Sequence, residues 1–295
     1  MTTWRLRLRP RSPWATPLRA DSLFGALCWA WVELFPESFD EMLSQFAGPG
    51  VPPFILSDAF PGDLLPLPLH VRTPVSEKKL KPPIYITQAG FQDLSVASGS
   101  LAPEVADKPF GSGSQIRTAI DRIVGSAAEG QLFELDIEHL QENFETLSVY
   151  VRSDRYLEQV IGCFKALALT GFGKKSSSGL GAFELLDKAQ DCDWLDGVEG
   201  ANAFVTLSHF VPAPHDPTNG RWRLHVTYPK FHANPVSNVF KGSIIMLTPG
   251  SVFRTDTGSP RPWYGSMIPM SRPEMPKAMH YALAFAVPVR WEERG

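Results

Sequence analysis

The sequence Thr170-Gly-Phe-Gly-Lys-Lys-Ser-Ser-Ser-Gly-Leu-Gly181 determines how the rest of this chain is interpreted. It contains four glycines, two lysines and three serines, and no acidic residue. An apolar helical pattern precedes it at 154–169, and a short strand-like run follows at 182–186. Glycine permits positive φ and close backbone approach, so such a loop can present its N–H groups to an anion. The stretch is therefore a candidate phosphate-binding loop.

Two known phosphate loops do not fit this stretch. The triphosphate P-loop requires glycine where Ala168 stands, and the dinucleotide fingerprint requires glycine where Ser176 stands. Both motifs run strand, loop, helix, whereas here the loop follows a helix, whose C-terminal dipole repels anions. Phosphate binding would therefore depend on loop amides and lysines. The alternative interpretation is a helix stop, with Gly171 at the C′ position and the lysines complementing the dipole.

The distribution of charge favours one basic and one acidic surface. The net charge of −3 argues against nucleic acid bound over the whole molecule. However, the first 20 residues contain five arginines and no acid, and residues 217–255 contain five Lys or Arg and no acid. Acidic residues gather at 129–145 and 187–199. Such segregation indicates that basic and acidic side chains occupy different surfaces.

The cysteines and the N-terminus predict a cytoplasmic protein. Cys28, Cys163 and Cys192 lack CxxC spacing, which favours buried thiols over disulfides or zinc. The N-terminus has no apolar region of a secretory signal, and the longest apolar run, 23–32, is too short to span a bilayer. The seven histidines show neither HxxxH nor HExxH spacing, so we expect no metal site, and no cofactor.

The chain begins with strict alternation. In Trp4-Arg-Leu-Arg-Leu-Arg9, the apolar residues share one face of a predicted strand and the arginines share the other. The arginine face is expected to be solvated, although three adjacent arginines repel one another without an anion or an acidic partner.

Helical and strand patterns then alternate along the first half. A helix is predicted from an N-cap at Asp21 to Phe35, where Pro36 stops it. The stretch 48–115 contains eleven prolines, so we expect a long insertion that contains no long regular element. Its features are a short strand at 84–86, a basic projection at 78–81 and a flexible run at 111–114. Strands are predicted at 132–137 and 146–151, and the helix at 154–169 is capped by Ser153 or Asp154.

The resulting order, βαββαβ, is the ferredoxin-like plan, in which helices cover one face of the sheet. RNA-recognition modules use the other face of such a sheet. We therefore predict an α+β protein with a ferredoxin-like domain at 1–188, an acidic linker at 189–200 and a degenerate ferredoxin-like domain at 201–295. The second domain has predicted strands at 203–210, 221–228, 243–248 and 280–287, and no convincing helix.

Two smaller sets of residues leave alternatives open. Arg117 and Arg122 could pair locally with Asp121 or contact phosphate beside the glycine loop. His225, Tyr228, Lys230 and His232 could supply a metal-independent endoribonuclease, which needs only a His base, a Lys and a Tyr.

Together these features resemble the RAMP superfamily of CRISPR effector subunits, and most closely the family of fourth subunits of type III-A Csm complexes. The residues that carry the resemblance are Ala20–Trp29, Leu56–Pro61 with Pro66 and Pro68, Arg117–Arg122, Gly171–Gly181, and Phe240–Gly242 with Pro249-Gly250. The related type III-B subunit fits less well.

The resemblance implies a non-catalytic scaffold. It would bind the 5′ handle of CRISPR RNA (crRNA) and join the large polymerase-like subunit to the backbone RAMP subunits, meeting target RNA only indirectly. A thumb-like projection within 75–115 would bend the RNA near the start of the guide. The implied RNA-binding residues are Arg19, Ser22, Arg117, Arg122, Gly171, Phe172, Gly173, Lys174, Lys175, Ser176, Ser177, Ser178, Gly179, Leu180, Gly181 and Lys241. In this interpretation Gly171 ends the helix while 174–181 hold the RNA. The competing function is an endoribonuclease that cuts CRISPR repeat RNA.

Overall fold

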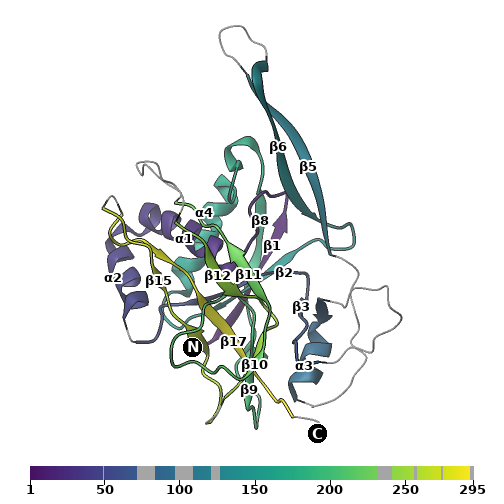
Figure 1. Ribbon diagram of the computed structural model, residues 1–295, viewed down its shortest axis with the longest axis vertical. Helices are drawn as coiled ribbons and strands as arrows, with labels where there is room; N and C mark the ends of the chain where they lie inside the picture. Colours follow the sequence, from purple (N-terminus) through teal and green to yellow (C-terminus); the bar gives the residue numbers. More distant parts are fainter. Residues whose placement is uncertain are drawn as a thin grey trace.

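The N-terminal strand lies at the centre of a four-stranded antiparallel sheet, as Figure 1 shows. Strand β1 (Thr3–Pro10) pairs with β7 (Leu147–Arg152) on one side and β8 (Phe183–Asp191) on the other. Strand β2 (Ile55–Pro61) pairs with β7 and completes the order β2-β7-β1-β8. The computed structural model describes residues 1–48, 50–71, 84–96, 109–120, 127–231, 241–255, 258–273 and 275–292.

Two helices pack side by side on one face of this sheet. They are α1 (Ala20–Leu34) and α4 (Leu157–Thr170), and both join Leu6 and Leu8 of β1 in one core. Apolar residues three and four positions apart give each helix a stripe to bury. The buried side chains are Leu23, Phe24, Leu27, Ala30 and Trp31 in α1, and Val160, Cys163, Phe164 and Leu167 in α4. The strand at 4–9 and both helices are therefore confirmed.

The ends of α1 differ from the prediction. Asp21 is not the N-cap but lies in the first turn, and Asp58 of β2 accepts a hydrogen bond from the Ala20 N–H at 2.9 Å. A carboxylate from a distant strand thus satisfies a donor that a local cap usually takes. Pro36 ends α1 but also begins α2 (Pro36–Ala47), where its missing N–H costs nothing in the first turn. Helix α2 was not predicted.

The proline-rich stretch is more regular than predicted. Besides β2, it contains β3 (Leu64–Pro66), β4 (Tyr85–Thr87) and α3 (Gln88–Val96). The prediction that 48–115 contains no long regular element was wrong, because the prolines lie at or beside the ends of these segments. Pro53 precedes β2, and Pro61 is the last residue of this edge strand, where a missing N–H is tolerated. The short strand predicted at 84–86 is confirmed as β4. The predicted basic projection at 78–81 lies outside the described residues.

A long hairpin projects from the body of the molecule (Figure 1). It consists of β5 (Phe110–Ile120) and β6 (Ala127–Leu140), which pair with each other and not with the central sheet. Two predictions are corrected here. The strand at 132–137 belongs to this hairpin, so β2 and not this strand is the neighbour of β7. The run 111–114, predicted to be flexible, is part of β5.

The second half is built of strands. A five-stranded sheet has the order β10 (Gly220–Arg221), β13 (Val252–Arg254), β9 (Ala203–Thr206), β17 (Leu283–Val289) and β14 (Trp263–Gly265). Two smaller pairs are β11 (Leu224–Thr227) with β12 (Ile244–Leu247), and β15 (Ile268–Pro269) with β16 (Met279–His280). In the described part of 201–295 no helix occurs.

The two halves share their cores. The predicted linker at 189–200 is instead ordered, because β8 continues to Asp191 and a short 3-10 helix, η2, spans Asp193–Leu195. Leu195 is buried in a cluster that contains Ile55 and Tyr150 from the first half and Phe285 from the second. Tyr281 packs against Phe24 with ring centroids 5.1 Å apart, and its hydroxyl accepts a hydrogen bond from the Leu56 N–H at 2.8 Å.

Candidate nucleic-acid interface

The glycine loop ends α4 as predicted. Gly171 has a φ of 78°, and its N–H donates to the Leu167 carbonyl at 2.8 Å. The chain then takes left-handed conformations at Gly173, Lys175 and Gly179 around the 3-10 turn η1 (Ser176–Ser178). These positions explain why the loop needs more glycines than a simple helix stop.

The loop is fastened to the segment that follows β1. The Gly181 N–H donates to the Pro13 carbonyl at 2.8 Å, and the Lys174 N–H donates to the Thr16 hydroxyl at 2.8 Å. A Cβ on Gly181 would overlap the carbonyl oxygen of Phe172. Backbone meets backbone here, so the loop has a fixed shape that holds its side chains in place.

This fixed shape uses most of the loop amides. Hydrogen bonds inside the fold take the N–H groups of residues 171, 172, 174, 176 and 178–181. The expectation that loop amides bind phosphate therefore fits poorly, because a donated N–H is not available to an anion. Lys174, Lys175, Ser177 and Ser178 are exposed, so their side chains are the groups left to meet one.

Two members of the predicted site are core residues. Phe172 is 2% exposed and packs with Leu8 and Phe183 in the main core, so it offers no surface for a base. Leu180 is 3% exposed and packs against Leu135 and Ile137 of β6. Their role is to fasten the loop to the sheet and to the hairpin, and we withdraw both as RNA-contacting side chains.

The hairpin brings Arg117 to the loop. Arg117 is directly opposite Phe133 in the β5–β6 ladder, and the Lys175 Nζ lies 5.2 Å from the centroid of the Phe133 ring. The Arg117 guanidinium donates to the Gln115 side-chain oxygen at 2.8 Å. Arg117, Phe133 and Lys175 therefore form one basic and aromatic cluster. Arg122, Asp121 and the local ion pair proposed between them lie outside the described residues.

A second basic cluster lies at the start of α1. Arg19 donates from Nη1 to Nε2 of His225 on β11, and the ring of His209 lies 5.1 Å from that of His225. The Nδ1 of His209 lies 2.5 Å from Asp58 Oδ2. Burial lowers the pKa of His225, and the Arg19 guanidinium lowers it further. His209 and Asp58 were missed because their partners are far away in the sequence.

Lys241 and Ser22 belong to the same region. Burial lowers the pKa of Lys241, while Asp21 raises it. Burial also lowers the pKa of His280 to about 4, although its Nε2 lies 3.7 Å from Asp21 Oδ2. The Ser22 hydroxyl donates to Asp21 Oδ1 at 3.4 Å. Asp21 thus offsets part of the positive charge that Arg19 and Lys241 bring.

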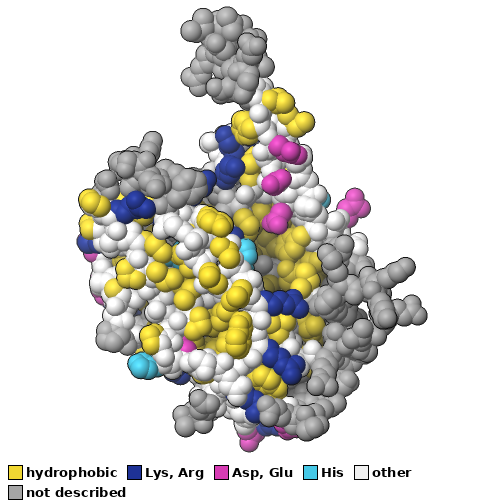
Figure 2. All heavy atoms as spheres, viewed as in Figure 1, with side chains coloured by type: hydrophobic (Ala, Val, Ile, Leu, Met, Phe, Trp, Pro, Cys, Tyr) yellow, Lys and Arg dark blue, Asp and Glu magenta, His cyan; other side chains and the backbone are white. Residues whose placement is uncertain are grey.

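The two clusters are close in the chain. Thr16 contacts the glycine loop and Arg19 contacts β11. Only two residues lie between them, so their Cα atoms are at most about 11 Å apart. Figure 2 shows Lys and Arg side chains on one side of the hairpin and acidic side chains along its other edge. The acidic residues there are Glu134, Asp136 and Glu138, all exposed.

The arginine face of β1 is not open, in contrast to the prediction. Asp63 lies 2.6 Å from Arg5 and 3.5 Å from Arg7, and Glu184 pairs with Arg9 and Arg11. The chain itself supplies the acidic partners that three adjacent arginines require.

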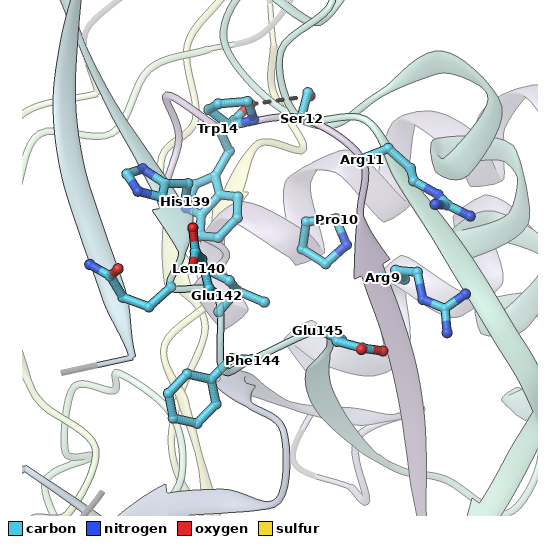
Figure 3. Close-up of a pocket in the computed structure, with 12 residues that line it drawn as sticks. Arg9, Pro10, Arg11, Ser12, Trp14, His139, Leu140, Glu142, Phe144 and Glu145 are labelled. Carbon is cyan, nitrogen blue, oxygen red and sulfur yellow. Dashed lines mark hydrogen bonds between the residues drawn. The ribbon is translucent and has the colours of Figure 1, made fainter. Parts of the chain in front are cut away.

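A pocket of about 390 Å³ opens where β1 ends beside the end of β6. Arg9 and Arg11 lie on one side of it, and Trp14 and His139 on the other (Figure 3). The pocket combines cations already paired to Glu184 with a Trp14 whose Nε1 donates to Glu138 at 3.1 Å. None of its residues belongs to the predicted RNA-binding set.

The residues of the ribonuclease alternative do not converge. His225 turns inward to Arg19, whereas Tyr228 is exposed with Leu224 and Val226 on the opposite face, and His232 lies outside the described residues. Among the described residues, no group of three His, Cys, Asp or Glu side chains could hold a metal ion. In the same residues, no helix is long and apolar enough to cross a membrane.

Comparisons place the chain among known proteins. A family model of the RAMP superfamily matches residues 16–184, which include the glycine loop and Arg19. A chain from the crystal structure of a Csm1-Csm4 cassette with AMPPNP is 20% identical, with a TM-score of 0.62 over 99% of this chain and 100% of that chain. A chain from the Csm3-Csm4 subcomplex of the type III-A CRISPR-Cas interference complex is 13% identical, with a TM-score of 0.63 over 98% of this chain and 100% of that chain.

At these identities the solved structures show a shared fold. No curated protein sequence gives a match. The family model, in contrast, spans more than half of the 295 residues. The chain therefore belongs to the RAMP superfamily.

Proposed function

We propose that this chain is the fourth subunit of a type III-A CRISPR interference complex. In that role it is a non-catalytic subunit that binds the 5′ handle of crRNA and joins the large polymerase-like subunit to the backbone RAMP subunits. The observation that carries the proposal is the end-to-end fold match to chains from two assemblies that have Csm4 in common, one with Csm1 and one with Csm3.

We also interpret the first half as a ferredoxin-like unit. The central sheet runs β8-β1-β7-β2, and the chain order β1, α1, β2, β7, α4, β8 is βαββαβ when α2, the smaller elements and the hairpin are set aside. In the second half, the antiparallel five-stranded sheet would be the degenerate counterpart.

The RNA interface that we propose consists of the two basic clusters. In the first cluster, Lys175 and Arg117 lie beside Phe133 on the hairpin, and Lys174 precedes Lys175 in the loop. In the second, Arg19 lies with Lys241 at the start of α1. Recognition of single-stranded RNA requires cations that follow the backbone and surfaces for unstacked bases. We assign the thumb-like projection to the β5–β6 hairpin, which begins within the predicted insertion at 75–115 and projects from the body of the molecule (Figure 1).

The lysines of the loop provide the first test. Replacing both, Lys174→Ala with Lys175→Ala, should weaken binding of handle RNA because two phosphate contacts are lost. For single strands each contact contributes about 0.7 to the slope of log K against log salt, so the slope should fall by about 1.4. Filter binding over a salt series measures it.

The control removes the same charge elsewhere. Lys188→Ala with Lys277→Ala alters two exposed lysines outside the loop, one on β8 and one that pairs with Asp40 of α2 at 2.8 Å. This control should keep the salt slope of the wild type. Unchanged affinity of the loop variant at both low and high salt, with the fold intact, would reject the loop as a phosphate site.

The assembly role has its own test. Co-expressed with the large and backbone subunits and a CRISPR array, the chain should co-purify with both subunits and with RNA whose sequenced 5′ ends share the repeat-derived handle. Co-purification without small RNA would contradict handle binding while leaving the assembly role in place.

A further inference from the structure

A column of aromatic rings runs through the second half and ends at the surface. Tyr264 and Phe204 stack with centroids 3.9 Å apart and an interplanar angle of 10°. Phe204 stacks on Phe253 at 5.5 Å and 25°, and Phe253 stacks on Trp222 at 5.8 Å and 9°. The inner three rings are buried, whereas Trp222 is 47% exposed. One face of the Trp222 indole is therefore backed by the column, and solvent reaches its ring.

The backbone fixes Trp222 in this position. Gly220 and Arg221 of β10 pair with Phe253 and Val252 of β13, directly before Trp222. A Cβ on Gly220 would overlap the Val252 carbonyl oxygen, so glycine allows this close pairing. An aromatic surface held in this way loses little conformational entropy when another ring stacks on it.

Trp222 begins an apolar face that the alternation of 221–228 would normally bury. Leu224, Val226 and Tyr228 continue it along β11, and Ile245 of β12 lies beside Val226 in the ladder. All of these side chains are exposed, and Figure 2 shows hydrophobic side chains gathered over this part of the molecule. A contiguous exposed apolar patch of this kind marks a binding surface.

The charged residues around this apolar face are basic, which favours an anionic ligand. Residues 217–255 include both strands of this face and contain five Lys or Arg and no acid. Arg221 and Arg223 are exposed beside Trp222, and His225 on the inward face of β11 meets Arg19 of the proposed RNA interface. Cations interleaved with aromatic surfaces are the pattern that binds single-stranded nucleic acid.

We propose that the outer ring of this column, Trp222, is a stacking platform for a base of single-stranded RNA. The proposal rests on the proposed function and extends it, because it assigns base contact to Trp222, between β10 and β11, whereas the loop and α1 supply phosphate contact. The base would add one more ring to the column, and Arg221 and Arg223 would face the adjoining phosphates.

The experiment compares two variants at one position. Trp222→Ala removes the ring, whereas Trp222→Phe keeps an aromatic surface, and both change a half-exposed side chain. The ligands are handle RNA and inorganic polyphosphate, which carries charge without bases. Loss of one stacked base should weaken RNA binding by Trp222→Ala about 5- to 150-fold. Binding of polyphosphate should be unchanged, and Trp222→Phe should recover most of the RNA affinity.

The possible outcomes distinguish base stacking on Trp222 from binding of handle RNA by the chain as a whole. If the wild type binds RNA and Trp222→Ala binds it equally well, the stacking platform is wrong and handle binding stands. If the wild type does not bind RNA, both are wrong. If Trp222→Ala binds RNA normally but no longer co-purifies with the large subunit, the face is a protein interface and the inference is overturned.

Discussion

Arg152 joins the two halves at the scale of a single residue. Its side chain is 1% exposed, lies 2.9 Å from Asp196 and donates to the backbone oxygens of Pro262 and Ala286. The guanidinium also lies 4.3 Å from the Phe285 ring centroid. Burial lowers the pKa of Arg152, and Asp196 opposes that shift. A buried arginine of this kind is stabilising only while all of its partners are present.

Arg152→Met should therefore destabilise the protein strongly, because it leaves Asp196 without its ion-pair partner and removes the guanidinium donor from the Pro262 and Ala286 carbonyls. Breaking a buried ion pair costs about 3–5 kcal/mol in the free energy of unfolding, measured here by urea denaturation. Arg155→Met is the matched control, since Arg155 is 66% exposed and pairs with Glu41 at 3.0 Å. An exposed pair is worth about 0–1 kcal/mol. Equal losses in the two variants would contradict this role for Arg152.

Single residues also show which parts of the candidate site could be predicted from the sequence. Lys174 and Lys175 are exposed as expected, and Arg117 lies beside the loop. An aromatic residue in a glycine-rich loop, such as Phe172, suggests a surface on which an RNA base can stack. Phe172 is nevertheless buried, because burial depends on what packs around a residue and not on the residue itself. Trp222 shows the reverse case, since its alternating pattern indicates a buried face and the structure exposes it.

At the scale of elements, the glycine loop combines two kinds of glycine. Gly179 has a φ of 84° and nothing near its missing Cβ, whereas Gly181 has a φ of 66° and faces the Phe172 carbonyl. The first glycine is needed only for its backbone conformation. The second is needed also because the returning chain passes directly against it.

Gly181→Ala should therefore cost more than Gly179→Ala. An alanine in the left-handed region costs about 1–2 kcal/mol. At Gly181 the overlap with backbone adds to that cost and displaces the loop, so the salt slope of RNA binding should fall as well. Urea denaturation and filter binding of the two variants measure this difference. Similar stability and similar RNA binding would show that the loop adapts to the extra atom.

The elements that could be predicted are those with a local signal. Alternation identified β1, and helical spacing with a following glycine identified α4. Strand β2 was missed because proline density was given more weight than the apolar run between Pro53 and Pro61. The β5–β6 hairpin was misplaced because β6 alternates like a sheet strand, and only tertiary contacts decide which strand pairs with β7.

For the whole molecule, the shared cores argue against two units that fold separately. Tyr281 and Leu283 lie in the core built on α1 and α4, and Leu195 lies in a core with Ile55 and Tyr150. A boundary near residue 188 follows from composition, but it divides both of these clusters. Side chains of the second half therefore form part of the hydrophobic core of the first half.

Residues 1–200, which keep β8 and η2 whole, should therefore not fold stably alone. Removal of the second half exposes Phe24 and Leu56 where Tyr281 covered them and takes the backbone partners Pro262 and Ala286 from Arg152. The fragment should bind a hydrophobic dye and unfold without a cooperative transition in urea, whereas the full chain unfolds cooperatively. Supplying residues 201–295 as a second polypeptide should restore the transition. A cooperative transition of 1–200 alone, with the urea midpoint of the full chain, would instead support the boundary predicted from composition.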